Sequence, residues 1–231
     1  MIGTEATDSL PASVPTDSGL DAIYAEISRY YTDKVTQFGA TPLGVDWTCV
    51  PTQQLRFVQL LKLCDFTRSF SLNDLGCGYG ALLAYLDWRH AECTVDYTGV
   101  DLSAALIAHA HQLWRGRPRV RFAPGHRCSN VADYSIASGI FNVQLEQPLE
   151  VWEAFVRSSL AHLHSSSRVG FAVNFMLEPD AGQRARAGLY VTTPSRWASY
   201  CAEQFAATTE IIRDYGLREF TLVVRRPKGS I

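Results

Sequence analysis

Three glycines preceded by an acid form the stretch whose residue types point most directly to chemistry. Gly76, Gly78 and Gly80 alternate with other residues, and Asp74 lies near the end of the short apolar run (70–75) before them. Glycines allow a sharp turn and the close approach of a ligand because they carry no Cβ. An Ala/Leu-rich stretch follows, and a helix starting there directs free N–H groups and its positive dipole end at the turn. The pattern predicts a strand, a turn and a helix that together bind a nucleotide cofactor.

Two cofactor classes fit this turn. Gly76, Gly78 and Ala81 satisfy the dinucleotide pattern G-x-G-x-x-G/A. With Asp74 and Gly80 the same stretch becomes acid-x-G-x-G-x-G, which resembles motif I of the class I S-adenosylmethionine (SAM)-dependent methyltransferases. In that family the acid and the glycine turn hold the amino-acid end of SAM. On this motif alone, SAM, NAD and a turn without a ligand all remain open.

A second acid lies where a cofactor ribose would be bound. Asp101 follows Gly80 by 21 residues, at the end of the next strand-like run (96–101). This spacing places its carboxylate at the C-terminal edge of the neighbouring strand, facing the same crevice. There it can accept hydrogen bonds from both ribose hydroxyls, of SAM or of NAD. Alternatively Asp101 caps the helix that follows, although Ser103 is equally suited to that role.

Composition limits the range of possible functions. The chain has 231 residues, 47% hydrophobic and 19% charged, which predicts one globular domain (20–231) after a disordered Ser/Thr/Pro-rich tail (1–19). The net charge of −2 argues against nucleic acid as the main partner. No apolar run approaches the ~18 residues of a membrane span. The six cysteines lack metal-ligand or disulfide-framework spacing, so we expect a cytoplasmic protein without a metal site.

Two helices are expected to form a cap (20–65) ahead of the glycine turn. The first (20–38) either packs one face on the domain or covers the cofactor, with Tyr30 or Tyr31 near the sulfonium. An aromatic face attracts such a cation. Arg56, on the second helix, is a candidate to bind the carboxylate of SAM by two parallel hydrogen bonds, or is a surface arginine.

The end of the chain favours SAM over NAD. Two strand-like runs (208–213 and 220–225) are only six residues apart, too few for the crossover helix of a parallel pair, so they must form an antiparallel hairpin. The predicted fold is α/β: a three-layer Rossmann-like sandwich with a seven-stranded, mostly parallel sheet whose last strand is antiparallel. The class I methyltransferase sheet that this resembles has the order 3-2-1-4-5-7-6. The resemblance covers about residues 20–226. It extends to a group of bacterial small-molecule-type methyltransferases in segments 44–47, 137–142, 189–190 and 214–221.

The resemblance implies two sets of site residues. The cofactor set is Tyr31, Arg56, Asp74, Gly76, Cys77, Gly78, Gly80, Asp101, Leu102, His126, Ser138 and Gly139. His126 departs from the family, which usually has an acid near the adenine amino group at this place. The acceptor is expected over the ends of strands four and five, beneath a lid (175–193). Candidates to orient it, or to act as a base, are Asn142, Glu146, Asn174, Tyr190 and Asp214, each of which could instead serve a turn or a cap. His162 and His164 are expected at the surface.

These inferences predict a SAM-dependent methyltransferase that acts on a small-molecule acceptor by in-line displacement. A second hypothesis is a methyltransferase of RNA or protein, for which the arginine run 115–121 would have to flank the site. We expect that run to form a solvated edge strand, because alternate side chains of a strand share one face. A third hypothesis is a protein that does not transfer methyl groups, either an NAD-dependent oxidoreductase or a protein that binds SAM without catalysis. The sequence does not predict an oligomeric state.

Overall fold

The computed structural model describes residues 19–179 and 186–227. The predicted tail, apart from Gly19, and the centre of the predicted lid lie outside these residues. The strands are β1 (Phe70–Leu75), β2 (Val95–Asp101), β3 (Val120–Pro124), β4 (Ala132–Ala137), β5 (Ser167–Leu177), β6 (Val191–Thr192), β7 (Thr208–Ile212) and β8 (Glu219–Arg225). The α-helices are α1 (Asp21–Phe38), α2 (Val50–Leu60), α3 (Ala81–Arg89), α4 (Ala104–Leu113), α5 (Leu149–Ser165) and α6 (Pro194–Phe205), with short 3₁₀ helices η2 (Pro42–Val45) and η3 (Leu61–Leu63).

The strands form one sheet in the order β3-β2-β1-β4-β5-β8-β7, with the two-residue β6 beside β5. β8 runs antiparallel to both of its neighbours, β5 and β7. The strands from β1 to β6 pair in parallel. The predicted hairpin and strand order are therefore confirmed, and only the short β6 was missed.

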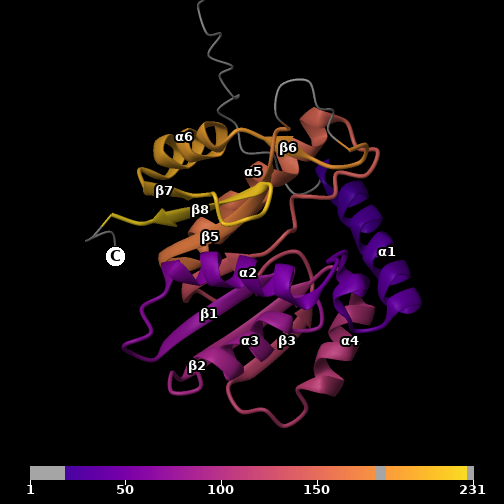
Figure 1. Ribbon diagram of the computed structural model, residues 1–231, viewed down its shortest axis with the longest axis vertical. Helices are drawn as coiled ribbons and strands as arrows, with labels where there is room; N and C mark the ends of the chain where they lie inside the picture. Colours follow the sequence, from indigo (N-terminus) through magenta and orange to yellow (C-terminus); the bar gives the residue numbers. More distant parts are fainter. Residues whose placement is uncertain (1–18, 180–185, 228–231) are drawn as a thin grey trace, which may run out of the picture.

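Alternating side chains divide the core between the two faces of the sheet. Leu72 of β1 packs in a cluster with residues of α2, α3 and α4. Phe171 of β5 packs in the opposite cluster with α1, α5 and α6. Figure 1 shows α2 and α3 on the near face of the sheet, in front of β1 and β2. The result is the expected three-layer sandwich, with the carboxyl ends of the parallel strands directed at one edge.

A connection of seven residues (125–131) joins β3 to β4 and contains no helix, although such parallel crossovers usually contain one. The connection is held on the sheet by hydrogen bonds: the N–H of Cys128 donates to Nε2 of His162 (2.8 Å), and Asn73 donates to the carbonyl of Asn130 (3.0 Å). His162 is therefore buried, so its predicted surface position is wrong; His164 is half-buried against Phe205.

The first helix lies along one side of the molecule beside α4 (Figure 1). Ser28 donates to the carbonyl of Leu102 (3.0 Å), and the hydroxyls of Thr32 and Ser103 are 2.8 Å apart. Both contacts lie just after the end of β2. α1 is thus fixed over the edge of the sheet to which the parallel strands point. No helix in the described part of the chain is long and apolar enough to cross a membrane.

The predicted lid (175–193) is part of the sheet at both of its ends. β5 continues to Leu177, and the ring of Phe175 is fully buried, stacked on Phe141 (4.9 Å between centroids). β6 then pairs with β5 near the other end. The ends of the predicted lid therefore belong to the sheet and not to an irregular segment.

Candidate cofactor site and active site

A cavity of about 900 Å³, including its open mouth, lies at the carboxyl ends of β1, β2 and β4. The turn after β1, the start of α4 and residues of the N-terminal cap line it. Of the predicted cofactor residues, all but Arg56 and Gly80 line this cavity: Tyr31, Asp74, Gly76, Cys77, Gly78, Asp101, Leu102, His126, Ser138 and Gly139. Ten of the twelve residues predicted for the cofactor site therefore line the same cavity.

Backbone conformation and close packing explain why two positions of the turn, 76 and 80, are glycine. Gly76 has φ of +76°, and a Cβ there would meet Ile140 at 2.2 Å, across the cavity floor. Gly80 has φ of +85°, and a Cβ there would meet the indole nitrogen of Trp114 at 2.5 Å. Gly80 is therefore required for packing at the start of α3, which accounts for its absence from the cavity lining.

Asp101 holds the glycine turn from the neighbouring strand. One of its carboxylate oxygens accepts from the N–H of Gly78 (2.9 Å) and the other from the N–H of Ser103 (2.8 Å). The side chain that caps α4 is Ser103, whose hydroxyl accepts from the N–H of Leu106 (3.3 Å). Burial raises the pKa of Asp101 to about 6, although the two N–H donors oppose the shift.

Asp74 is the second buried acid of the cavity and accepts a hydrogen bond from the hydroxyl of Tyr97. Burial raises its pKa to about 7; the Tyr97 bond opposes this shift and the nearby Asp101 adds to it. Among the described residues, neither carboxylate forms a salt bridge. Ser138 lines the same cavity, and its hydroxyl oxygen is buried without a hydrogen-bond partner. Unpaired carboxylates and an unpartnered hydroxyl together suit a ligand that carries a positive charge and several polar groups.

Aromatic side chains of the cap form another wall. Tyr31 of α1, Trp47 after η2 and Tyr79 in the glycine turn all line the cavity. Burial raises the pKa of the Tyr31 phenol, so this ring is neutral at physiological pH. A neutral aromatic face next to carboxylates favours a bound cation.

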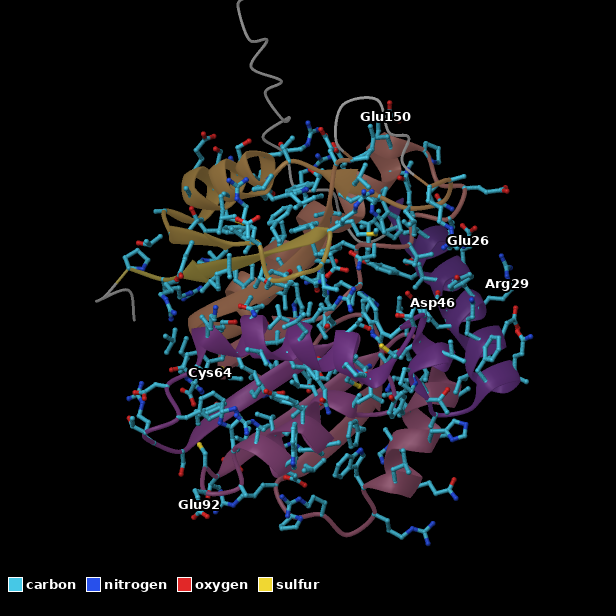
Figure 2. All side chains as sticks on the ribbon, in the orientation of Figure 1. Glu26, Arg29, Asp46, Cys64, Glu92 and Glu150 are labelled. Atoms are coloured by element: carbon cyan, nitrogen blue, oxygen red, sulfur yellow. The ribbon has the colours of Figure 1, made fainter. Side chains whose placement is uncertain are left out.

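Tyr30 has a different role, since it does not line the cavity. Its hydroxyl donates to Asp46 (2.6 Å), which also pairs with Lys34 (2.7 Å). Figure 2 shows Asp46 beside α1. This polar cluster fastens α1 to the segment that carries Trp47.

The fold is shared with solved methyltransferase structures. The magnesium protoporphyrin IX methyltransferase of Synechocystis PCC 6803, solved with bound SAH, matches with a TM-score of 0.59 and 13% identity over 89% of this chain and 99% of that one. The human N-acetylserotonin methyltransferase, solved with SAM, matches with a TM-score of 0.63 and 14% identity over 90% of this chain and 60% of that one. At these identities, the likeness establishes the fold. No family model matches the chain.

A sequence relative decides the family. The chain is 38% identical over 166 residues to the Mycobacterium tuberculosis protein named "Putative methyltransferase Rv1506c", a match that covers 72% of this chain and 99% of that one. The chain belongs to the class I SAM-dependent methyltransferases. The resemblance of the glycine turn and of the sheet to this family is thereby confirmed.

In this methyltransferase, Arg56 has a partner other than the predicted ligand carboxylate. Its Nε donates to Glu219 (2.7 Å), its Nη2 donates to the other oxygen of the same carboxylate, and its Nη1 donates to the carbonyl of Thr52 (2.8 Å). Arg56 is buried and stacks on Trp47, with its Cζ 3.9 Å from the ring centroid. The guanidinium thus makes the bidentate pair expected of it, but with a residue of the methyltransferase itself.

Of the five candidate acceptor residues, Asn142 and Tyr190 are in contact, since the N–H of Tyr190 donates to the backbone carbonyl of Asn142 (3.0 Å). None of the five lines the described cavity. Asn174 is fully buried and donates to Glu219, and Tyr190 is buried, with its hydroxyl on Glu153 (3.2 Å). Asp214 is 89% exposed in a turn.

The other two lie on the loop after β4. Glu146 is exposed there, and Asn142 is buried with its side-chain amide oxygen unpartnered. The cavity lining also contains residues that were not predicted for the site, among them Trp47, Gln53 and Tyr79. Trp47 had a signal in the sequence as part of segment 44–47, and Tyr79 lies between two glycines of the turn, whereas Gln53 had none.

Proposed function

We propose that the chain binds SAM in the cavity at the carboxyl ends of β1, β2 and β4 and transfers its methyl group to a small-molecule acceptor. The observation that carries this proposal is a pair of buried carboxylates, Asp74 and Asp101, without a cationic partner in the described chain, beside a wall of aromatic rings. Asp101 would bind the ribose hydroxyls. Asp74 and the glycine turn would hold the amino-acid end, and Leu102 and His126 the adenine.

When bound, SAM supplies a methyl group activated by a sulfonium, and the acceptor's lone pair forms the new bond as the C–S bond pair returns to sulfur. The protein has to place the acceptor in line with that bond and exclude water, which can supply several kcal/mol. We assign Tyr31 and Trp47 to the acceptor side, because both rings face the cavity from the cap.

Three observations support a small-molecule acceptor. The cavity is concave and is lined largely by apolar and aromatic side chains, as small-molecule sites usually are, and α1 contributes part of its wall. Within the arginine run, Arg117 pairs with Asp87 (2.5 Å) and Arg119 with Asp96 (3.1 Å), which lowers the charge available for RNA. Structural neighbours include enzymes named for N-acetylserotonin and mitomycin, both small molecules.

The cofactor assignment is tested by calorimetric titration of the purified protein with SAM, S-adenosylhomocysteine and NAD in parallel. We expect micromolar binding of the first two and none of NAD. Binding of NAD alone would contradict the proposal, and so would the absence of binding by SAM and its product.

The acceptor class is tested by release of S-adenosylhomocysteine in the presence of pooled small amines, phenols and thiols, with RNA and protein pools run beside them. We expect turnover with a small-molecule pool that changes little with salt. Turnover with RNA only, falling steeply as salt rises, would favour a nucleic-acid acceptor instead.

A further inference from the structure

Three segments that resemble one group of methyltransferases, 44–47, 137–142 and 214–221, converge on a single buried cluster. Trp47 comes from the first, Gly139 from the second and Glu219 from the third, with Arg56 between them. None of the proposed steps of methyl transfer uses Arg56 or Glu219. Their convergence beneath the cavity therefore requires its own explanation.

The cluster forms a continuous chain of contacts from α2 to the cavity floor. Arg56 binds both oxygens of Glu219. Oε2 of Glu219 also accepts from the amide of Asn174 (2.8 Å), whose own oxygen accepts from the N–H of Gly139 (2.7 Å). Gly139 lines the cavity, so the charge pair and the cavity floor are connected by two hydrogen bonds.

Sheet register explains why Asn174 forms the link. Asn174 pairs with Thr221, and Met176 pairs with Glu219, in the antiparallel β5–β8 ladder. Asn174 and Glu219 are therefore diagonal neighbours on one face, within reach of each other's side chains. The same register directs Glu219 toward α2, which carries Arg56.

Trp47 holds the Gly139 turn from the other side. Gly139 has φ of +77°, and a Cβ there would lie 2.3 Å from the Trp47 ring. The opposite contact of that ring is the Arg56 guanidinium, 3.9 Å from its centroid. The Gly139 turn thus lies between the indole of Trp47 and the amide of Asn174. Arg56 contacts the indole, and its partner Glu219 accepts a hydrogen bond from the amide.

We propose that Arg56, Glu219 and Asn174 are positioning residues that fix the Gly139 turn, and with it the hydroxyl of Ser138, for SAM. The inference rests on the proposed function. None of the three side chains lines the cavity, whereas Asp74 and Asp101 do, so we expect the three to contact neither cofactor nor acceptor. Their effect passes through the backbone N–H of Gly139.

The test compares Asn174→Ala with a matched control, Thr221→Val. Thr221 is the register partner of Asn174 and is equally buried, and its hydroxyl lies 3.3 Å from that of Tyr215 rather than on the cavity turn. Both variants remove a buried polar group from the same face, and the measurements are made well below the melting temperature of each. One readout is exchange of the Gly139 amide, followed by NMR in the ligand-free protein, and the other is the Kd for SAM.

We expect Asn174→Ala to raise the exchange rate of Gly139 and the Kd for SAM by about tenfold each, and Thr221→Val to change neither by more than about twofold. If Asn174→Ala does not fold, Glu219→Gln replaces it, since the amide keeps the volume but has one acceptor oxygen in place of two and no charge to pair with Arg56. Unchanged SAM binding in folded Asn174→Ala or Glu219→Gln would overturn the inference, as would equal weakening by Thr221→Val.

A wild-type chain that binds no SAM would instead refute the proposed function. In that case the exchange rate of the Gly139 amide still tests whether Asn174 fixes the turn. Faster exchange in Asn174→Ala alone supports this role. Equal exchange in wild type, Asn174→Ala and Thr221→Val overturns it.

Discussion

Two groups of buried acids differ in how their charge is met. Glu219 is 3% exposed and binds Arg56 through both oxygens, with Asn174 as a third donor. Asp74 and Asp101 are 2% and 8% exposed and are met only by N–H and O–H donors of the described chain. We call the first the complete site, because an arginine of the chain neutralises its carboxylate. We call the second the incomplete site, because no cation of the described chain pairs with its two carboxylates.

This difference distinguishes a carboxylate that stabilises the fold from carboxylates that are suited to bind a ligand. A buried carboxylate with a cationic partner inside the chain stabilises a fold only as long as the pair is intact. A buried carboxylate without one has a raised pKa and favours a ligand that supplies the missing charge. Glu219 accordingly lies beneath the cavity, and the two unpaired aspartates lie in its wall.

The largest expected effect comes from breaking the complete site. Arg56→Ala leaves Glu219 buried without a cation, so we expect the free energy of unfolding to fall by about 3–5 kcal/mol. Urea denaturation measures this loss. The double variant Arg56→Met/Glu219→Met should recover much of the loss because no charge then remains buried. A single variant as stable as wild type would mean that the pair does not contribute to the fold.

Removing a charge from the incomplete site should affect binding more than folding. Asp101→Asn keeps the size of the side chain but removes its charge, so we expect SAM binding to weaken by about 1.5–3 kcal/mol. The substitution weakens the hydrogen bonds to the N–H groups of Gly78 and Ser103, but it also removes the cost of burying a charge. Because these two effects oppose each other, the free energy of unfolding should change by less than about 1 kcal/mol. Calorimetry and urea denaturation on the same preparation measure both. Unchanged SAM affinity would remove Asp101 from the binding site.

The pH dependence gives a third test. Burial raises the pKa of Asp74 to about 7 and that of Asp101 to about 6, above the value of about 4 in an unfolded chain. The ligand-free protein therefore loses stability as pH rises from about 4 to 7, because its carboxyls hold protons that the unfolded chain releases. Binding of cationic SAM requires the ionised form, so its affinity should rise, on the order of tenfold, between about pH 5.5 and 7.5.

Calorimetry in two buffers of different ionisation enthalpy detects the protons released on binding. Asp74→Asn serves as the control and should flatten the affinity profile, since the group with the higher pKa is gone. An affinity that does not change over this range would contradict an unpaired, desolvated pair of acids.

The smallest effect concerns a third acid, which is partly exposed and already paired. Asp46, whose side chain is 22% exposed, is met by Lys34 and by the hydroxyl of Tyr30. Tyr30→Phe removes one of these bonds, and we expect it to lower the free energy of unfolding by about 0.5–1.5 kcal/mol. The Kd for SAM should change by less than about threefold, since the ring remains. A larger loss of binding than of stability would place Tyr30 in the site after all.

Local patterns in the sequence were enough to bring the residues of the incomplete site to one cavity. The strand, glycine turn and helix around Asp74 and the 21-residue spacing to Asp101 depend on neighbouring residues and on a common sheet geometry. The hairpin followed from a short connection. All of these features could be derived without knowing which distant segments meet.

The complete site could not be derived in this way. Arg56 and Glu219 are 163 positions apart, and their pairing depends on the register of β8 against β5. An arginine ahead of the glycine strand therefore looked available for a ligand. The burial of His162 was missed for a similar reason, because it depends on the short connection between β3 and β4 crossing the sheet without a helix.

That short connection also affects the order of events during synthesis. The ring of Tyr24 on α1 stacks on His126 (4.3 Å between centroids), about 100 residues later in the chain. At about 5–20 residues per second, the ribosome needs about 5–20 s to add the residues that separate them. α1 emerges before the strands at whose edge it lies, and its contact with His126 can form only after the connection has been synthesised. Over that interval, its apolar side chains Ile23 and Ile27, which are buried in the finished domain, are open to chaperones.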